Sequence, residues 1–246
     1  MRGALSQFLA SILINSIYAM KNYPVILINT VLSPLSFLIL ITLASGGSLI
    51  GEAVEGSLIM TMFSSGTSLQ GDLSHLKNDY RLQDMVVGSP ARAGAYVAGM
   101  TISELIYSSP ALAILSVLFY FYVHVTPLQL VAIVAVMLLM FLTSVSIGFL
   151  LATVSSDIVE SFAYTRLLST LFSTIPPVYY PISYIPLPWR YLAYLSPTTY
   201  ASEIAQNAAG LVKQTPINID AAWLVLLAVT AVFFTISLTK ARWREK

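Results

Sequence analysis

The sequence predicts an all-α polytopic membrane protein. Hydrophobic residues make up 57% of the 246-residue chain, charged residues only 9%, and the mean hydropathy is +0.80. A soluble domain usually carries about 25% charged residues, and a transmembrane helix needs roughly 20 mostly apolar residues. The composition therefore excludes an ordinary water-soluble enzyme. The chain has no cysteine, which excludes disulfides and thiolate metal sites.

The N-terminal residues 1–22 predict an amphipathic helix that lies in the membrane interface. Its apolar residues recur at helical spacing on one stripe: Leu5, Phe8, Leu9, Ile12, Leu13, Ile17 and Met20. Its polar residues lie off that stripe: Ser6, Gln7, Ser11 and Asn15. A segment of this pattern is too polar to cross a bilayer but suits its surface. Pro24 then opens the next helix, because a first helical turn does not need the missing N–H.

Six apolar stretches predict six transmembrane helices. We place them at residues 24–44, 52–70, 95–123, 128–154, 158–182 and 221–240. They are separated by Gly46-Gly47, the charged segment 72–92, Thr126-Pro127, Ser155-Ser156-Asp157 and the proline-rich connection 183–220. In that last connection, before the final span, repeated prolines predict short re-entrant helices at the outer side.

The distribution of basic residues predicts the orientation. With six spans both termini share a side, and that side holds nine of the twelve basic residues. They are Arg2, Lys21, Lys77, Arg81, Arg92, Lys240, Arg242, Arg244 and Lys246. Because basic residues concentrate on the cytoplasmic side, both termini are expected in the cytoplasm and the protein in the plasma membrane.

The sequence lacks the motifs of several enzyme classes. There is no G-x-x-x-x-G-K-[ST] phosphate loop, so the chain is not expected to bind ATP itself. The only histidines, His75 and His124, fall on opposite sides of the membrane, which argues against a metal site or a catalytic dyad. We therefore expect no catalytic residue, no metal and no cofactor in this chain, and no nucleic-acid partner.

The charged segment 72–92 predicts a short amphipathic helix on the cytoplasmic side. Leu73, Leu76, Tyr80, Leu82 and Met85 alternate with charged residues before the stop Gly88-Ser89-Pro90. Such a surface suits docking to a cytosolic partner. From these residues alone, a solvated loop that merely joins two spans is an equal alternative.

Two groups of residues carry a resemblance to a known family. The first comprises Arg81-Leu82, Val86-Val87-Gly88-Ser89-Pro90, Gly94-Ala95-Tyr96 and Gly99. The second comprises Pro181, Pro186-Leu187-Pro188-Trp189, Tyr194-Leu195 and Ser196-Pro197-Thr198-Thr199-Tyr200. In this order they resemble the ABC-2 type permeases, in particular the drug-efflux-like branch. The resemblance covers residues 1–246 as one transmembrane domain, although Gln206 stands where many relatives have a basic residue.

The resemblance implies partners and a mechanism. Two permeases would pair, as a homodimer or a heterodimer in membrane lipid, each docked on a separate ABC ATPase subunit that holds ATP and Mg. The implied ATPase-coupling residues are Asp79, Tyr80, Arg81, Leu82, Gln83 and Asp84. The complex would export a hydrophobic or amphipathic small molecule or lipid-like solute.

Of the ionisable residues inside predicted spans, three are functional candidates, because a charge at membrane depth is costly. They are Glu104, Glu160 and Arg166. Glu160 lies near the cytoplasmic end, where it can reach water. Arg166 is expected to pair with Glu104 or a partner subunit, or alternatively to contact the solute.

The end of the fifth span predicts an outer gate. Pro176 and Pro177 would kink the helix, and Tyr179 and Tyr180 would line the exit. The alternative is that the aromatic residues there form only an interfacial belt. Within the second span, the small residues 64–68 predict close helix packing or, alternatively, the lining of a pathway.

Other functions remain open at this point. A polysaccharide, glycolipid or peptide exporter is compatible with the proline- and tyrosine-rich outer segment. An ATP-independent secondary transporter would need paired intramembrane charges and internal repeats. The sequence has few charges of this kind and no internal repeat. A scaffold that pairs with an active permease is the third alternative.

Overall fold

The computed structural model describes residues 2–22, 24–78, 93–155, 157–174, 176–212 and 215–240. Every regular element within these ranges is a helix, which confirms the predicted all-α class. The elements are α1 Arg2–Ile12, the π-helix η1 Leu13–Tyr18, α2 Ala19–Asn22, α3 Pro24–Ala44, α4 Ile50–Asn78, α6 Ala93–Tyr122, α7 Pro127–Val154, α8 Ile158–Thr174, the 3-10 helix η2 Ile182–Tyr184, α9 Arg190–Ala193, α10 Pro197–Ala208 and α11 Ile219–Lys240.

Four of the described helices are long and apolar enough to cross a membrane. The qualifying segments are Leu27–Ala44, Val97–Tyr122, Pro127–Val154 and Ile219–Thr239. They match the first, third, fourth and sixth predicted spans. The helices at the second and fifth positions differ, because acidic and hydroxyl side chains make α4 less apolar and α8 has only 17 residues.

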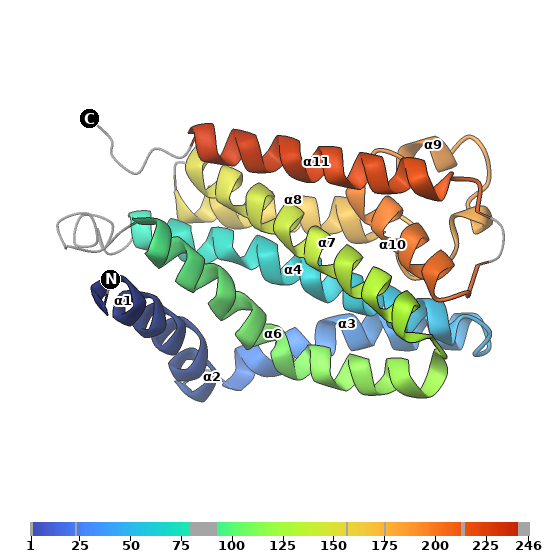
Figure 1. The fold of residues 1–246 in the computed structure, drawn as a ribbon, viewed down its shortest axis with the longest axis horizontal. Coiled ribbons are helices and arrows are strands. Elements are labelled where there is room, and N and C mark those ends of the chain that lie inside the picture. The colour runs from blue at the N-terminus through green and yellow to red at the C-terminus, as the bar shows by residue number, and fades with distance from the viewer. Residues whose placement is uncertain are drawn as a thin grey trace.

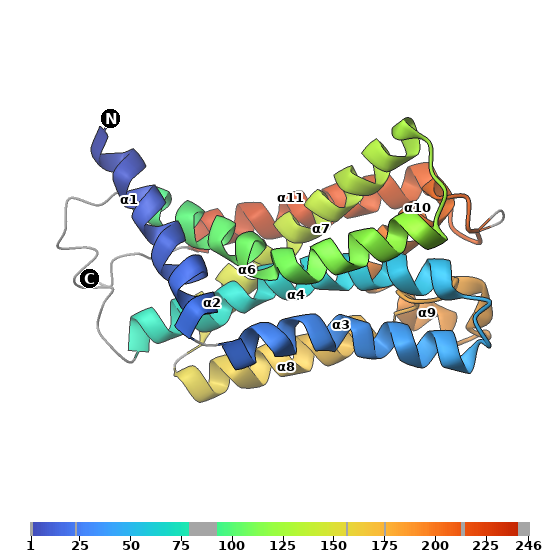
Figure 2. The same cartoon turned by 90° about the horizontal axis from the view of Figure 1, so that it is seen from below.

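The long helices form an elongated bundle with α4 at its centre (Figure 1). Figure 2 shows α4 running between α3 and α8 on one side and α7 and α11 on the other. α4 contacts α3, α6, α7, α8 and α10, and every residue from 51 to 63 is buried. A helix enclosed in this way does not need the apolar exterior of a lipid-facing span, which explains its polar composition.

Glycine permits the close approach of α4 to α7. A Cβ atom on Gly66 would lie 1.9 Å from the Oγ atom of Ser144, and one on Gly148 would lie 2.9 Å from the carbonyl oxygen of Gly66. Only a residue without a side chain fits at either place. The close packing predicted for residues 64–68 is therefore present at Gly66.

Polar contacts hold α4 against α8 in the C-terminal part of α4. The Nε2 group of Gln70 donates to the carbonyl oxygen of Ser161 at 2.7 Å, and the hydroxyls of Ser74 and Ser161 share a hydrogen bond of 2.6 Å. All three residues are buried. Buried hydrogen bonds of this kind fix the rotation of one helix against its neighbour.

The chain between α8 and α11 forms a cap at one end of the bundle. α8 ends at Thr174, earlier than the predicted span 158–182, because Pro176 and Pro177 cannot supply the N–H groups that a continuing helix needs. The short elements η2, α9 and α10 follow at the end opposite to α1 and to the last turn of α11 (Figure 1). α10 is packed on α4, α7, α8 and α11.

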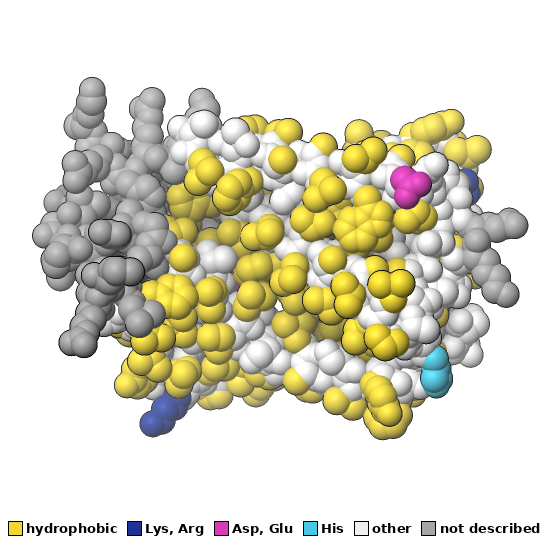
Figure 3. Space-filling view, viewed as in Figure 1, with side chains coloured by type: hydrophobic (Ala, Val, Ile, Leu, Met, Phe, Trp, Pro, Cys, Tyr) yellow, Lys and Arg dark blue, Asp and Glu magenta, His cyan; other side chains and the backbone are white. Residues whose placement is uncertain are grey.

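The exterior of the bundle is apolar along its length. Large exposed side chains on α3, α6, α7 and α11 include Val25, Leu43, Val117, Val131 and Leu238, each more than half exposed. In the view of Figure 3, apolar side chains cover the middle of the molecule, and the coloured charged residues lie towards its ends. This distribution is that of a surface solvated by lipid.

Candidate functional site

A cavity of about 720 Å³ lies beside α4, between α3, α6 and α8. Its largest share of side chains comes from α4: Met60, Thr61, Ser64, Ser65, Ser68 and Asp72. Asn15 and Ala19, from the N-terminal helices, and Ser169 and Thr170, from α8, complete parts of the wall. The N-terminal segment predicted as interfacial thus also contributes to the cavity.

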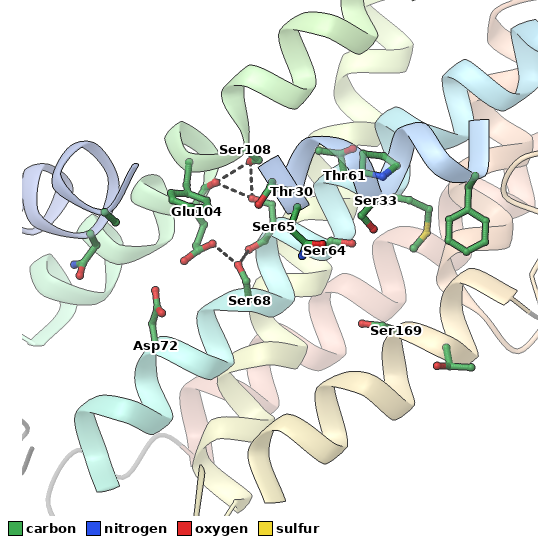
Figure 4. A pocket seen from close by; sticks show the side chains of 18 of the residues that line it. Thr30, Ser33, Thr61, Ser64, Ser65, Ser68, Asp72, Glu104, Ser108 and Ser169 are labelled. Carbon is green, nitrogen blue, oxygen red and sulfur yellow. Dashed lines mark hydrogen bonds between the residues drawn. The ribbon is translucent and has the colours of Figure 1, made fainter. Parts of the chain in front are cut away.

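Two carboxyl groups lie at one end of this cavity. Glu104 of α6 is 8% exposed, and its side chain accepts a hydrogen bond from the Ser68 hydroxyl of α4. Asp72, one turn further along α4, interacts with Glu104 (Figure 4). Two acids from different helices therefore face each other beside a row of hydroxyl groups.

A serine network fixes Glu104 against α4. The hydroxyl oxygens of Ser65 and Ser108 lie 2.9 Å and 2.7 Å from the carbonyl oxygen of Glu104 and 2.9 Å from each other, and Figure 4 shows these contacts as dashed lines. Each hydroxyl has one proton to donate, so one can donate to the carbonyl oxygen while the other donates to it or to the first hydroxyl. The backbone at Glu104 is thus held in place, and its side chain is aimed from a rigid position.

The other end of the cavity is aromatic and apolar. The ring of Tyr179 stacks on that of Phe37, with 5.2 Å between the centroids and an interplanar angle of 10°. Both rings line the cavity together with Pro34 and Met60. The cavity is therefore polar and acidic at one end and apolar and aromatic at the other.

The three predicted intramembrane charges differ in their surroundings. Glu104 interacts with Ser68 and Asp72, whereas Arg166 is exposed on α8. Glu160 is half-buried in the first turn of α8 and accepts a hydrogen bond of 2.8 Å from the hydroxyl of Tyr164. Of the three, only Glu104 lines the cavity.

The predicted gate residues form an ordered, buried segment. Pro176, Pro177 and Tyr179 are buried, and Tyr180 is half-buried. Tyr179 lines the large cavity, whereas its neighbour Tyr180 lines a smaller one of about 300 Å³ beside the turn that follows α3. The two tyrosines predicted to line one exit therefore border different cavities.

α10 holds this gate segment from behind. The backbone N–H of Ile182 donates to the Glu203 carboxylate at 2.9 Å, and the Ser202 hydroxyl donates to the carbonyl oxygen of Val178 at 2.9 Å. Gln206 donates to Ser202 at 2.8 Å. Burial raises the pKa of Glu203, while the Ile182 N–H and the charge of Arg190 act to lower it.

Sequence reasoning missed Asp72, Glu203 and Ser202 as site residues. Asp72 falls in the predicted cytoplasmic segment 72–92, but α4 continues to Asn78 and carries it on the same helix as Ser65 and Ser68. The usable signal was the spacing of Ser65, Ser68 and Asp72, three and four residues apart, which places them on one helical face. The predicted coupling residues, Asp79 to Asp84, lie outside the described residues.

A helical bundle with a lipid-type exterior and an interior amphipathic cavity defines a multi-pass membrane transport protein. The family model of the ABC-2 type transporter matches residues 6–209, and the chain belongs to that family. It is accordingly a permease component of an ABC transporter and is not itself the ATPase. A comparison with curated proteins found no match.

Proposed function

We propose that this chain is the permease subunit of an ATP-driven exporter for a hydrophobic or amphipathic solute. The observation that carries the proposal is the cavity of about 720 Å³, which is acidic and hydroxyl-lined at one end and aromatic at the other. Small-molecule sites span roughly 300–1,000 Å³, so the size favours a compact solute over a polysaccharide chain. The solute leaves the cytoplasm or the inner leaflet.

The proposed topology has six spans, with α4 and α8 added to the four apolar helices. α4 tolerates polar side chains because its neighbours enclose it. α8, with 17 residues, is about 26 Å long, close to the roughly 30 Å of a hydrocarbon core. This arrangement places both termini in the cytoplasm and the cap of α9 and α10 at the outer face of the plasma membrane.

The proposed assembly pairs two permeases, identical or different, with separate ABC ATPase subunits that carry ATP and Mg. ABC-2 permeases generally pair with such subunits. In this proposal the ATPase docks on residues 79–84 and on the N-terminal helices, and nucleotide-driven motion there would move α4 and α6, which precede and follow residues 79–84 in the chain. The buried segment around Tyr179 and Tyr180 then acts as the outer gate.

The test is purification of the tagged full chain in mild detergent, with mass spectrometry of what accompanies it. A stoichiometric protein with a phosphate-binding loop is expected, and Arg81→Glu should remove it by reversing a charge in the docking segment. Asp220→Lys, exposed in the first turn of α11, is the matched control and should retain it. Absence of any ATPase, even with an ATP analogue present, would instead favour an ATP-independent transporter.

A further inference from the structure

The charges that line the large cavity have one sign. Glu104 and Asp72 contribute two carboxyl groups, and no lysine, arginine or histidine is among the described residues that line it. We propose that the cavity selects an organic solute with a positive charge, held by Glu104. This inference rests on the proposed export function and specifies the substrate class of the same site.

Glu104 is placed to act as the anchor. Its side chain accepts a hydrogen bond from the Ser68 hydroxyl and is also hydrogen-bonded to Asp72. A carboxylate has about four acceptor positions, so these two contacts leave capacity for a ligand. Asp72 interacts with Glu104, and a cation beside the pair relieves the repulsion between two acids.

Two described basic residues, Arg166 and Lys21, are close in sequence to lining residues but are not part of the lining themselves. Arg166 is one turn from Thr170, which lines the wall, but its side chain is exposed on α8. Lys21 follows Ala19 closely in α2 and is likewise exposed. Tyr107 also lines the cavity within electrostatic range of Glu104 and Asp72, and an aromatic ring there can stabilise a cation that approaches its face.

The apolar end indicates that the cation is organic rather than a bare metal ion. From Met60 to Asp72 the cavity follows α4 for about 18 Å, given a rise of 1.5 Å per residue. Phe37 and Tyr179 stack near the Met60 end, where an inorganic ion would gain nothing. Within the described residues, no group of three acidic or histidine side chains is arranged to hold a metal.

The experiment uses two probes that match in shape and differ in the sign of their charge. Binding of radiolabelled tetraphenylphosphonium and of tetraphenylborate is measured on the full chain in lipid nanodiscs. We expect the cation to bind and the anion to bind about tenfold more weakly or not at all, as an ion pair in a partly buried site requires. Equal binding of both probes would overturn the proposal.

Variants locate the charge that matters. Glu104→Gln keeps an acceptor for the Ser68 hydroxyl and should weaken binding of the cation about tenfold or more. Asp72→Asn, on the other helix, should weaken it in the same direction. Asp220→Asn removes one exposed acid in the first turn of α11, which does not line the cavity, and should leave the affinity unchanged. Unchanged affinity in both cavity variants would overturn the inference.

The two tests fail independently. Probe binding needs neither ATP nor the ATPase subunit, so loss of charge selectivity would leave ATPase association intact and would point to a neutral solute. Conversely, selective binding without any associated ATPase would keep the cation site and refute the ATP-driven mechanism. Elution of each variant as a single species on size exclusion confirms that a loss of binding is local.

Discussion

At the scale of single residues, the cap depends on a few buried polar groups that satisfy each other. Glu203 is fully buried, and the Ile182 N–H donates to one of its carboxylate oxygens. A buried donor without an acceptor costs about 1–3 kcal/mol. The side chain of Glu203 therefore supports the gate segment. Its contribution to stability as a hydrogen-bond acceptor can be separated from the contribution of its charge.

We expect Glu203→Ala to destabilise the protein by about 1–3 kcal/mol, because the buried N–H of Ile182 loses its acceptor. Glu203→Gln keeps a carbonyl oxygen at the same reach and should lose less. Thermal unfolding of the detergent-solubilised chain, followed by tryptophan fluorescence, measures both. Equal stability of the alanine variant and the wild type would show that the hydrogen bond contributes nothing.

At the scale of elements, the helices were predictable and their mutual arrangement was not. Apolar runs of about 20 residues locate α3, α6, α7 and α11, because a span in lipid must carry apolar residues over its whole length. Prolines at 176 and 177 marked the end of α8, although the prediction extended the span beyond them. The length of α4 was underestimated, since the helix continues through polar residues such as Asp72 and Ser74, which are still partly or fully buried.

The cavity could not be predicted from the chain because its members are remote in sequence. Ser68 and Glu104 are 36 positions apart and meet only when α4 packs on α6. Glu104 could be singled out as a charge at membrane depth, yet its partner Asp72 lay in a segment assigned to the cytoplasm. Rotation of each helix about its axis, which packing decides, determines which polar residues converge.

A substitution at Gly66 tests the close contact between α4 and α7. Gly66→Ala places a Cβ atom 1.9 Å from the Ser144 Oγ and 2.7 Å from the backbone nitrogen of Val145, so the helices must separate. Overpacking of this kind costs about 1–3 kcal/mol. Gly71→Ala, on the same helix, meets its nearest atom at 3.8 Å and should be tolerated.

Thermal unfolding of the two alanine variants, prepared side by side, gives the comparison. The substitution adds the same methyl group to α4 in each case, so differences in helix propensity cancel. A larger drop in the unfolding temperature for Gly66→Ala is expected. Equal temperatures would mean that α4 and α7 lie further apart than the structure places them.

At the scale of the whole molecule, the two ends of the bundle define the two sides of the membrane. The turn between α6 and α7 lies at the same end as the cap, because Val123 and Val125 pack in one cluster with Ala209 and Leu211. His124 lies in that turn and is exposed, so it reports the side on which the cap lies. Asp157, exposed between α7 and α8, gives the complementary position.

The chain's lack of cysteine makes the measurement direct, because one introduced cysteine is the only thiol. We expect His124→Cys in intact cells to react with a membrane-impermeant maleimide, and Asp157→Cys to react only after permeabilisation. Leu195→Cys, 80% exposed in the cap, should react together with His124→Cys, because the cap and this turn share one end of the bundle. Reaction of Asp157→Cys in intact cells, with His124→Cys and Leu195→Cys reacting only after permeabilisation, would place the cap on the cytoplasmic side and overturn the proposed orientation.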